Sequence, residues 1–402
     1  MKAVGVIVEY NPFHNGHKFH LTQAKEHTNA DIVIAVMSGN FLQRGEPALV
    51  SKWARTEMAL NGGADLVFEI PYQFATQNAD LFASGAVSLL GAAKCQSICF
   101  GSEDGDIESF LETHQFLKDH DLEFQQNVKE YIGHGVSYPK ALSLSFNDLS
   151  PNKKILDLTK PNNILGIQYV TAIHDQKLPI KPITITRKNA NYHDQHFASE
   201  SIASATSIRK SLFSQNGDVS GLQPYLPPTT YDLLLKYKKE YGQFHSWEDY
   251  WALLKYKLIQ SNPEELRNIH EVEEGLENRL LQSALYAESF QEFMEQIKTK
   301  RYTWARLQRV CLHILMNVKK AEIPKKKTAN YLRLLGMSEG GREYLNNKKK
   351  HFSLPLVSKP SASKTELELD IRSSRLYALG ATGENQNRLL KLEFSQPPIQ
   401  IK

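Results

Sequence analysis

A short apolar segment close to the N-terminus is followed at once by a polar turn that contains two histidines. Residues 4–8 read Val-Gly-Val-Ile-Val, a composition typical of a strand buried on both faces of a parallel sheet. Asn11-Pro12 breaks this strand, and residues 18–27 then have the apolar spacing of a helix. Strand, tight turn and helix together predict the corner of an α/β sheet where ligands bind, outside the carboxyl ends of the strands.

The turn itself reads His14-Asn15-Gly16-His17. A glycine between two histidines lets the backbone approach a ligand closely. Imidazoles beside the free N–H groups at the start of a helix form a site for an anion such as phosphate. Two ordinary surface histidines in a polar turn are the alternative. We favour the phosphate site because the tetrad directly follows an N-terminal apolar strand and the residues Asn-Pro-Phe.

Strand-like and helix-like segments alternate along the first half of the chain. This alternation predicts a Rossmann-like, doubly wound α/β fold on a parallel sheet. A mostly helical insertion is expected over 104–149, and a polar loop over 187–193. Further strands are predicted over 31–37, 64–70, 97–100 and 183–186, and helices after the capping residue Ser51, over 80–93 and from Asn162.

The proline-rich segment 224–228 marks the expected linker between two domains. We assign residues 1–223 to an α/β domain that contains the predicted phosphate site, and residues 224–402 to a mainly α-helical domain. Helical apolar spacing is found in the second part over 231–258, 264–287, 290–298 and 303–318, and one further helix is expected over 364–379.

The composition is that of a globular protein with room for two domains. Its 402 residues are 41% hydrophobic, enough to bury a sizeable core. Three cysteines without a CxxC pair or zinc spacing predict reduced thiols, no metal site and a cytoplasmic location. Met1-Lys2 leads directly into the first predicted strand, so no signal peptide is expected. No apolar run approaches membrane-spanning length, so no membrane association is expected.

Basic residues gather in the predicted helical half. The net charge of +4 is too small to indicate a nucleic-acid partner by itself, and each lysine run alone is typical of a solvated surface. Several runs interleaved with Tyr302, Trp304 and Tyr331 favour an RNA-facing surface. The residues predicted to contact RNA are Lys300, Arg301, Arg306 and Arg309, and further basic runs lie at 319–320, 325–327 and 348–351.

The histidine turn resembles the HxGH signature of the nucleotidylyltransferase superfamily, a Rossmann-like group. The resemblance implies that His14 and His17 contact the β- and γ-phosphates of ATP and stabilise the pyrophosphate leaving group. A second signature of that group, Ile-Ser-Ser-Thr-x-Ile-Arg, is similar to residues 203–209. Ala203 and Ala205 depart from it, while Thr206 and Arg209 remain in register to bind phosphate.

More specific motifs resemble those of the bacterial tRNA(Met) cytidine acetate ligase family, in order along nearly the whole chain. They lie at residues 9–17, 37–41, 43–48, 161–166 and 300–303. The resemblance implies that ATP, accompanied by Mg²⁺, activates acetate to acetyl-adenylate with loss of pyrophosphate. The acetyl group then passes to N4 of the wobble cytidine in elongator tRNA(Met). No oligomeric state is predicted.

The resemblance also implies a set of site residues. Acetate is ionised at neutral pH, so activation needs positioning and neutralisation of phosphate charge rather than a general base. The implied catalytic residues are His14, His17, Lys18, Thr206 and Arg209. The implied ATP-binding residues are Ile7, Val8, Glu9, Tyr10, Asn11, Pro12, Phe13, His14, Asn15, Gly16, His17, Lys18, Phe19 and His20, with Gly101, Asn162 and Arg187.

Several of these residues have plainer interpretations. Gly101 also suits an ordinary strand-end turn, Asn162 a helix N-cap and Arg187 a surface loop. Looser candidates for contacts with acetate or substrate are Ser38, Asn40, Lys52 and Arg55. The last two lie three residues apart on one helix face, where solvated charge is the plainer expectation.

Two other classes of function stay open. A nucleotidyltransferase could adenylylate a small phosphorylated metabolite without touching RNA, and the basic helical half argues against it. A non-catalytic RNA-binding module could retain a vestigial nucleotide fold. The intact His14, His17, Thr206 and Arg209 argue against that.

Overall fold

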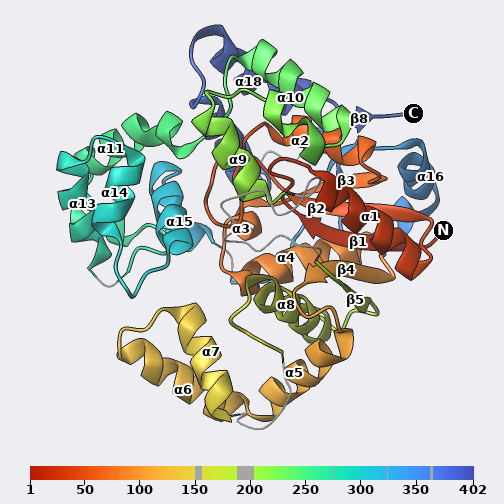
Figure 1. Cartoon of the computed structure of the whole chain (residues 1–402), viewed down its shortest axis with the longest axis horizontal. Coiled ribbons are helices and arrows are strands. Elements are labelled where there is room, and N and C mark those ends of the chain that lie inside the picture. Colours follow the sequence, from red (N-terminus) through yellow and green to blue (C-terminus); the bar gives the residue numbers. More distant parts are fainter. Residues whose placement is uncertain (150–155, 188–202, 274, 324, 363–364) are drawn as a thin grey trace.

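A single mixed sheet runs through the molecule (Figure 1). The computed structural model describes residues 1–149, 156–187, 203–273, 275–323, 325–362 and 365–402. In this part of the chain the sheet has eight strands in the order β5-β4-β1-β2-β3-β6-β7, with β8 paired to β6. Five parallel strands come from the first half of the chain: β1 (Ala3–Val8), β2 (Ile32–Ser38), β3 (Leu66–Ile70), β4 (Ser97–Ser102) and β5 (Lys181–Thr186).

The central strands are buried because both faces of the sheet carry helices. Along β2, Ile32, Ile34 and Val36 belong to one hydrophobic cluster, and Val33, Ala35 and Met37 belong to the other. This alternation follows from the two-residue period of a strand. One face is covered by α4 (Ala79–Ala92) and α8 (Pro161–Asp175), the other by α1 (Asn15–Thr28) and α2 (Lys52–Asn61). The predicted doubly wound α/β fold is confirmed.

The connections place a crevice beside β1. The chain passes from β1 outward through β2 to β3, and it then returns to β4 and β5 on the other side of β1. Ligands bind to doubly wound sheets where the strand order reverses in this way, outside the carboxyl ends of the strands. The first predicted strand and its turn therefore lie at the switch point of the sheet.

Two helical parts stand beside the sheet (Figure 1). The segment predicted as a mostly helical insertion contains α5 (Ile107–Asp119), α6 (Asp121–Gly133) and α7 (Tyr138–Leu149), with α5 packed on α8. A helical lobe, residues 247–273 and 275–318, has its own aromatic and aliphatic core. It contains α11 (Trp251–Gln260), α12 (Pro263–Arg267), α13 (Leu276–Tyr286), α14 (Phe290–Ile297) and α15 (Trp304–Leu315).

The remaining elements link these parts. The short α3 (Tyr72–Ala75) follows β3, α9 (Ala205–Ser214) follows β5, and α10 (Pro228–Tyr241) packs on α2. Short 3-10 helices lie at Ser220–Tyr225, Trp247–Tyr250, Lys320–Glu322, Lys349–His351 and Pro360–Ala362. The predicted loop over 187–193 lies almost wholly outside the described residues. None of the helices within the described residues is both apolar enough and long enough to span a membrane.

The second half of the chain is less purely helical than expected. It adds β6 (Leu332–Met337), which is antiparallel to β3, and the short strands β7 (Leu356–Val357) and β8 (Ile399–Gln400). Three helices also follow β6: α16 (Glu339–Lys348), α17 (Glu368–Ala378) and α18 (Gly383–Ser395). The second half was expected to be mainly α-helical, and these three strands were not predicted. The proposed division after residue 223 stays a prediction, and strands from both sides of it share one sheet.

Candidate active site

A cavity of ≈ 280 Å³ opens at the carboxyl ends of β1, β4 and β5, at the switch point of the sheet. It brings together residues that are up to about two hundred positions apart in sequence. Of the predicted site residues, those that line it are Ile7, Val8, Glu9, Tyr10, Asn11, His14, Gly16, His17, Phe19, His20, Gly101, Asn162, Arg187, Thr206 and Arg209.

Four residues of the predicted N-terminal stretch do not line this cavity. Phe13 is fully buried against Gly62, and Pro12 is also buried. Asn15 donates its side-chain N–H to the Pro224 carbonyl at 2.9 Å. Lys18, which was predicted to be catalytic, is exposed on α1 and lies outside the cavity lining. The Lys18 prediction therefore has no support in the geometry.

His14 and His17 are joined by a hydrogen bond and by ring stacking at the N-terminus of α1. His14 Nδ1 accepts a hydrogen bond from the Gly16 N–H at 3.1 Å, and His17 Nδ1 accepts one from the His14 N–H at 3.2 Å. Their rings stack with centroids 3.6 Å apart. A backbone N–H can only donate, so Nδ1 of each ring is unprotonated. Each neutral ring therefore carries its proton on Nε2, where it can donate to a ligand.

Both histidines are neutral at pH 7. Burial, with Arg187 and Arg209 nearby, lowers the pKa of His14 to about 3. Burial, His14 and Arg187 lower the pKa of His17 well below its usual value. Burial also lowers the pKa of His20 to about 4. The pair thus offers two N–H dipoles rather than two positive charges to an anion.

The second predicted signature begins α9 on the opposite side of the cavity. Ser204 is the N-cap of α9, and its hydroxyl accepts the Ser207 N–H at 3.1 Å. Thr206 and Arg209 both line the cavity. The Arg209 guanidinium donates to the Asn11 carbonyl at 2.9 Å and pairs with Glu46 at 3.0 Å. The two signatures are thus in direct contact, through Arg209 and Asn11.

Gly101, Asn162 and Arg187 form a third wall. A Cβ atom on Gly101 would lie 3.1 Å from the Arg187 side chain, so glycine leaves room for that side chain beside the cavity. Asn162 is the second residue of α8, and Lys160 is the N-cap. The interpretation of Asn162 as an N-cap was therefore wrong. Its amide donates to Glu103 at 2.7 Å, and Glu103 also accepts from the first N–H groups of α8.

The segment 42–46 was missed as part of the site. Leu42, Gln43, Arg44 and Glu46 line the cavity beside Glu9. Glu9 accepts the Gln43 N–H at 2.8 Å, and this bond ties the segment to the end of β1. The motif at 43–48 was quoted only for the family resemblance. Its Arg-Gly-Glu sequence, with two charges around a glycine, was the available signal for a functional loop.

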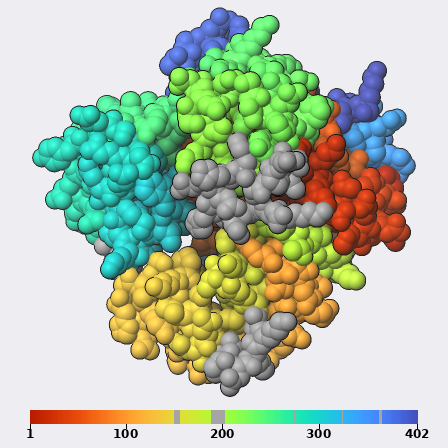
Figure 2. All heavy atoms as spheres, viewed as in Figure 1, coloured from red at the N-terminus to blue at the C-terminus, as the bar shows by residue number. Residues whose placement is uncertain are grey.

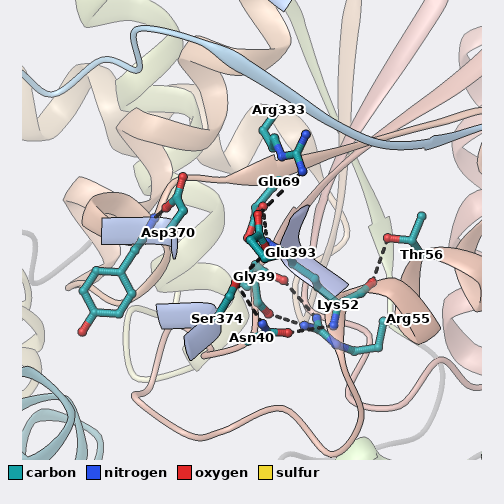
Figure 3. A network of polar contacts seen from close by, with 12 residues as sticks. Gly39, Asn40, Lys52, Arg55, Thr56, Glu69, Arg333, Asp370, Ser374 and Glu393 are labelled. Carbon is teal, nitrogen blue, oxygen red and sulfur yellow. Dashed lines mark hydrogen bonds and ion pairs between the residues drawn. The ribbon is translucent and has the colours of Figure 1, made fainter. Parts of the chain in front are cut away.

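The looser candidates Ser38, Asn40, Lys52 and Arg55 are buried outside the cavity lining. Asn40, Lys52 and Arg55 belong to a buried polar network (Figure 3). Lys52 is fully buried and pairs with Glu69 at 2.8 Å and with Glu393 of α18 at 2.7 Å. Arg55 donates to the backbone carbonyls of Glu9, Ser38 and Gly39. The expectation of solvated charge was wrong for Lys52 and Arg55, because both are fully buried. Arg55 holds the ends of β1 and β2, whereas Lys52 joins β3 to α18. Contacts of the four candidates with acetate or substrate stay a prediction.

The predicted RNA-facing residues are not equivalent. Lys300 and Arg301 are exposed at the start of the segment that leads into α15. Arg306 lies over the Tyr302 ring at 4.9 Å and 3.6 Å from Glu273. Arg309 is buried and pairs with Glu271 at 2.9 Å. Tyr302 and Tyr331 are buried as well, so the expectation that they interleave an exposed basic surface was wrong.

Figure 2 shows the outer face of the helical lobe above and to the left of the insertion. Lys300 and Arg301 are the exposed cations of the predicted set, and both belong to this lobe. No group of three or more His, Cys, Asp or Glu side chains is arranged to hold a metal ion within the ranges that the structure describes.

The comparisons with known proteins indicate one family, and their matches cover nearly the whole chain. A family model described as HIGH Nucleotidyl Transferase matches residues 1–391. The tRNA(Met) cytidine acetate ligase of Geobacillus sp. (strain WCH70) is 50% identical over 99% of this chain and 100% of its own length. That of Bacillus subtilis (strain 168) is 48% identical over 100% of this chain and 97% of its own.

Two crystal structures of Thermotoga maritima TmcAL match all of this chain and all of their own. The apo form I has a TM-score of 0.93 at 34% sequence identity. The form bound with alpha-thio ATP has a TM-score of 0.91 at 33% identity.

Proposed function

Because the chain belongs to the tRNA(Met) cytidine acetate ligase family, within the HIGH nucleotidyl transferases, we propose that it makes N4-acetylcytidine at the wobble position of elongator tRNA(Met). In the first step, an acetate oxygen attacks the α-phosphorus of ATP, and pyrophosphate leaves. In the second step, N4 of the cytidine attacks the carbonyl carbon of acetyl-adenylate, and AMP leaves. The reaction would take place in the cytoplasm.

One observation carries this proposal: the cavity at the switch point unites the two histidines of α1, the second signature on α9 and the predicted ATP-binding residues Gly101, Asn162 and Arg187. The crystal structure of the Thermotoga maritima protein bound with alpha-thio ATP supports a nucleotide in this fold. Arg209 contacts Asn11 and Glu46 in the wall of this cavity.

The first step needs charge stabilisation and alignment rather than a base. Pyrophosphate develops negative charge as it leaves, and preorganised N–H donors stabilise such charge most effectively in a buried site. The Nε2–H groups of His14 and His17 would supply two donors at the N-terminus of α1, where the positive end of the helix dipole also favours an anion. Thr206 and Arg209 would hold the phosphates from the side of α9.

Mg²⁺ would accompany ATP. An ion bound chiefly by phosphates and water needs few protein ligands, and the cavity fits this, since its described residues include no cluster of three metal-ligating side chains. When bound, the ion would neutralise phosphate charge.

Incubation of the protein with ATP, labelled acetate and total tRNA tests the proposal. After nuclease digestion, we expect the label in N4-acetylcytidine from elongator tRNA(Met), with AMP and pyrophosphate as products. If label is absent from RNA and AMP appears instead on a small phosphorylated metabolite, the enzyme is a nucleotidyltransferase of the second class considered above.

A further inference from the structure

Glu9 places a carboxylate in the wall of a cavity that must bind anions. It follows β1 directly, and its Oε1 accepts the Gln43 N–H at 2.8 Å. Its backbone carbonyl accepts a hydrogen bond from the Arg55 guanidinium at 2.7 Å, so the backbone and the side chain of Glu9 are both fixed by hydrogen bonds. Among the described residues no cation forms an ion pair with this carboxylate, whereas the neighbouring Glu46 is paired with Arg209 at 3.0 Å.

Binding of ATP or acetate does not account for this arrangement. Both ligands are anions, and a carboxylate without a paired cation raises the free energy of a nearby anion. The hydrogen bond to Gln43 uses one oxygen, and a neutral glutamine could make it equally well. The chemistry that needs a carboxylate here is therefore sought in the second step.

The second step brings a neutral amine into the same cavity, if the proposed function holds. We propose that Glu9 accepts the proton that N4 of the cytidine must lose when it is acetylated. The N4–carbon bond forms, the bond between the carbonyl carbon and the AMP phosphate oxygen breaks, and AMP leaves with that electron pair. The N4 proton passes to Oε2 of Glu9 and then to solvent.

The surroundings of Glu9 make it a better base than an exposed glutamate. Burial raises its pKa, the Gln43 hydrogen bond lowers it, and the charge of Glu46 raises it again, with a net increase. Arg44 and Arg209 oppose this increase from the segment 42–46 and from α9. Arg55 of α2 and Tyr169 of α8 also interact electrostatically with Glu9. A raised pKa makes the ionised carboxylate a stronger proton acceptor.

The test separates the two steps by supplying acetyl-adenylate directly. Single-turnover acetylation of a tRNA(Met) transcript is measured at saturating acetyl-adenylate over a pH series, so that the rate does not depend on nucleotide affinity. Glu9→Gln keeps the size and the bond to Gln43. We expect its transfer rate to fall about 10²–10⁴-fold and its increase with pH to disappear.

Two further variants make the result specific. Glu46→Gln removes another carboxylate of the same wall, and we expect it to keep the pH dependence of the wild type. Glu9→Asp keeps a carboxylate, and we expect it to retain the increase with pH at a reduced rate. A Glu9→Gln enzyme with an unchanged profile, or a flat profile for Glu9→Asp, would overturn the assignment. Failure of the wild type to acetylate the transcript would instead refute the proposed function.

Discussion

The backbone of Gly45 packs directly against the backbone of Arg309 in α15. A Cβ atom on Gly45 would lie 2.6 Å from the Arg309 nitrogen, and Gly45 has a φ of +81°. The next residue, Glu46, pairs with Arg209 in the cavity wall. The helical lobe therefore supports the segment that closes one side of the candidate active site.

Substitution of Gly45 by alanine should displace that segment. The clash with backbone atoms and the positive φ together cost roughly 1–3 kcal/mol, and the displaced Glu46 no longer orients Arg209. We expect a higher KM for ATP in acetate-dependent pyrophosphate release. Gly63→Ala is the matched control, because Gly63 has a φ of +113° but a Cβ atom added there would have no neighbour within 4 Å. An unchanged KM in Gly45→Ala would show that the contact does not shape the site.

The sequence predicted the sheet and its switch point because the relevant signals are local. Strands β1, β2 and β3 are buried, mainly apolar segments between turns, and Ser51 caps α2 as expected. β6 was missed because Leu-Arg-Leu-Leu-Gly-Met also suits a helix, and its pairing with β3 is a contact between residues more than 260 positions apart. Such pairing leaves no local pattern.

The site was predictable where it rests on contiguous motifs. The histidine turn and residues 203–209 could be read as two halves of one phosphate site, but not the contact between Arg209 and Asn11. The surroundings of Lys52 and Arg309 were wrongly predicted for one reason. The carboxylates that pair with them inside the protein, Glu393 and Glu271, lie far away in the sequence. Charged residues that lie close together in the sequence indicate a solvated surface only when no residue from a distant part of the sequence forms an ion pair with them in the fold.

His17 can be tested without disturbing the start of α1. In His17→Asn, the side-chain oxygen can replace Nδ1 as acceptor for the His14 N–H, but the Nε2–H donor is lost. We expect acetate-dependent pyrophosphate release to slow by about 10²–10³-fold, with little change in melting temperature. His17→Ala should be at least as slow. Release at a rate near that of the wild type in His17→Asn would rule out donation to the leaving group.

Acid should destabilise the protein through its buried histidines. His245 has a pKa lowered to about 3 by burial, and its Nδ1 lies 2.8 Å from the Tyr250 hydroxyl. In the unfolded chain this histidine becomes protonated below about pH 6.5, whereas in the folded chain it stays neutral until the pH falls to about 3. Its contribution to the free energy of unfolding is therefore fully present above pH 6.5 and decreases as the pH falls toward 3. At pH 5 the loss from this residue is about 2 kcal/mol.

Chemical denaturation at pH 7.5 and pH 5 checks this prediction. His245→Asn keeps an amide donor for Tyr250 but does not titrate. The decrease in unfolding free energy between the two pH values should therefore be smaller in this variant by about 2 kcal/mol. An identical decrease in both proteins would mean that His245 is accessible to protons in the folded state.

The network around Lys52 should behave as a unit. In Lys52→Met, Glu69 and Glu393 lose the ammonium that both contact at 2.8 Å or less. Breaking a buried pair on one side typically costs about 3–5 kcal/mol. The double variant with Glu69→Gln removes one uncompensated carboxylate and leaves Glu393 beside Arg333 at 3.6 Å, so we expect it to regain part of that loss. Additive losses in the double variant would contradict a coupled network.

The predicted RNA contacts now separate into two kinds. Lys300 and Arg301 are exposed on the helical lobe, while Arg309 is buried with Glu271. We expect Lys300→Ala with Arg301→Ala to weaken tRNA binding and acetyl transfer, with little effect on pyrophosphate release in the absence of tRNA. Arg309→Ala should instead lower stability, because Glu271 is left buried without its partner.

A salt series distinguishes phosphate contacts from indirect effects. Each lost contact should reduce the slope of log affinity against log salt by about 0.7–0.9, so the double variant should lose up to about twice that. Lys349→Ala with Lys350→Ala is the matched control, since these exposed lysines follow α16, on the other side of the view in Figure 1 from the helical lobe. Parallel slopes for the Lys300 and Arg301 variant and the wild type would exclude these residues as phosphate contacts. A reduced slope for the control alone would move the RNA-binding surface to the end of the sheet beside α16.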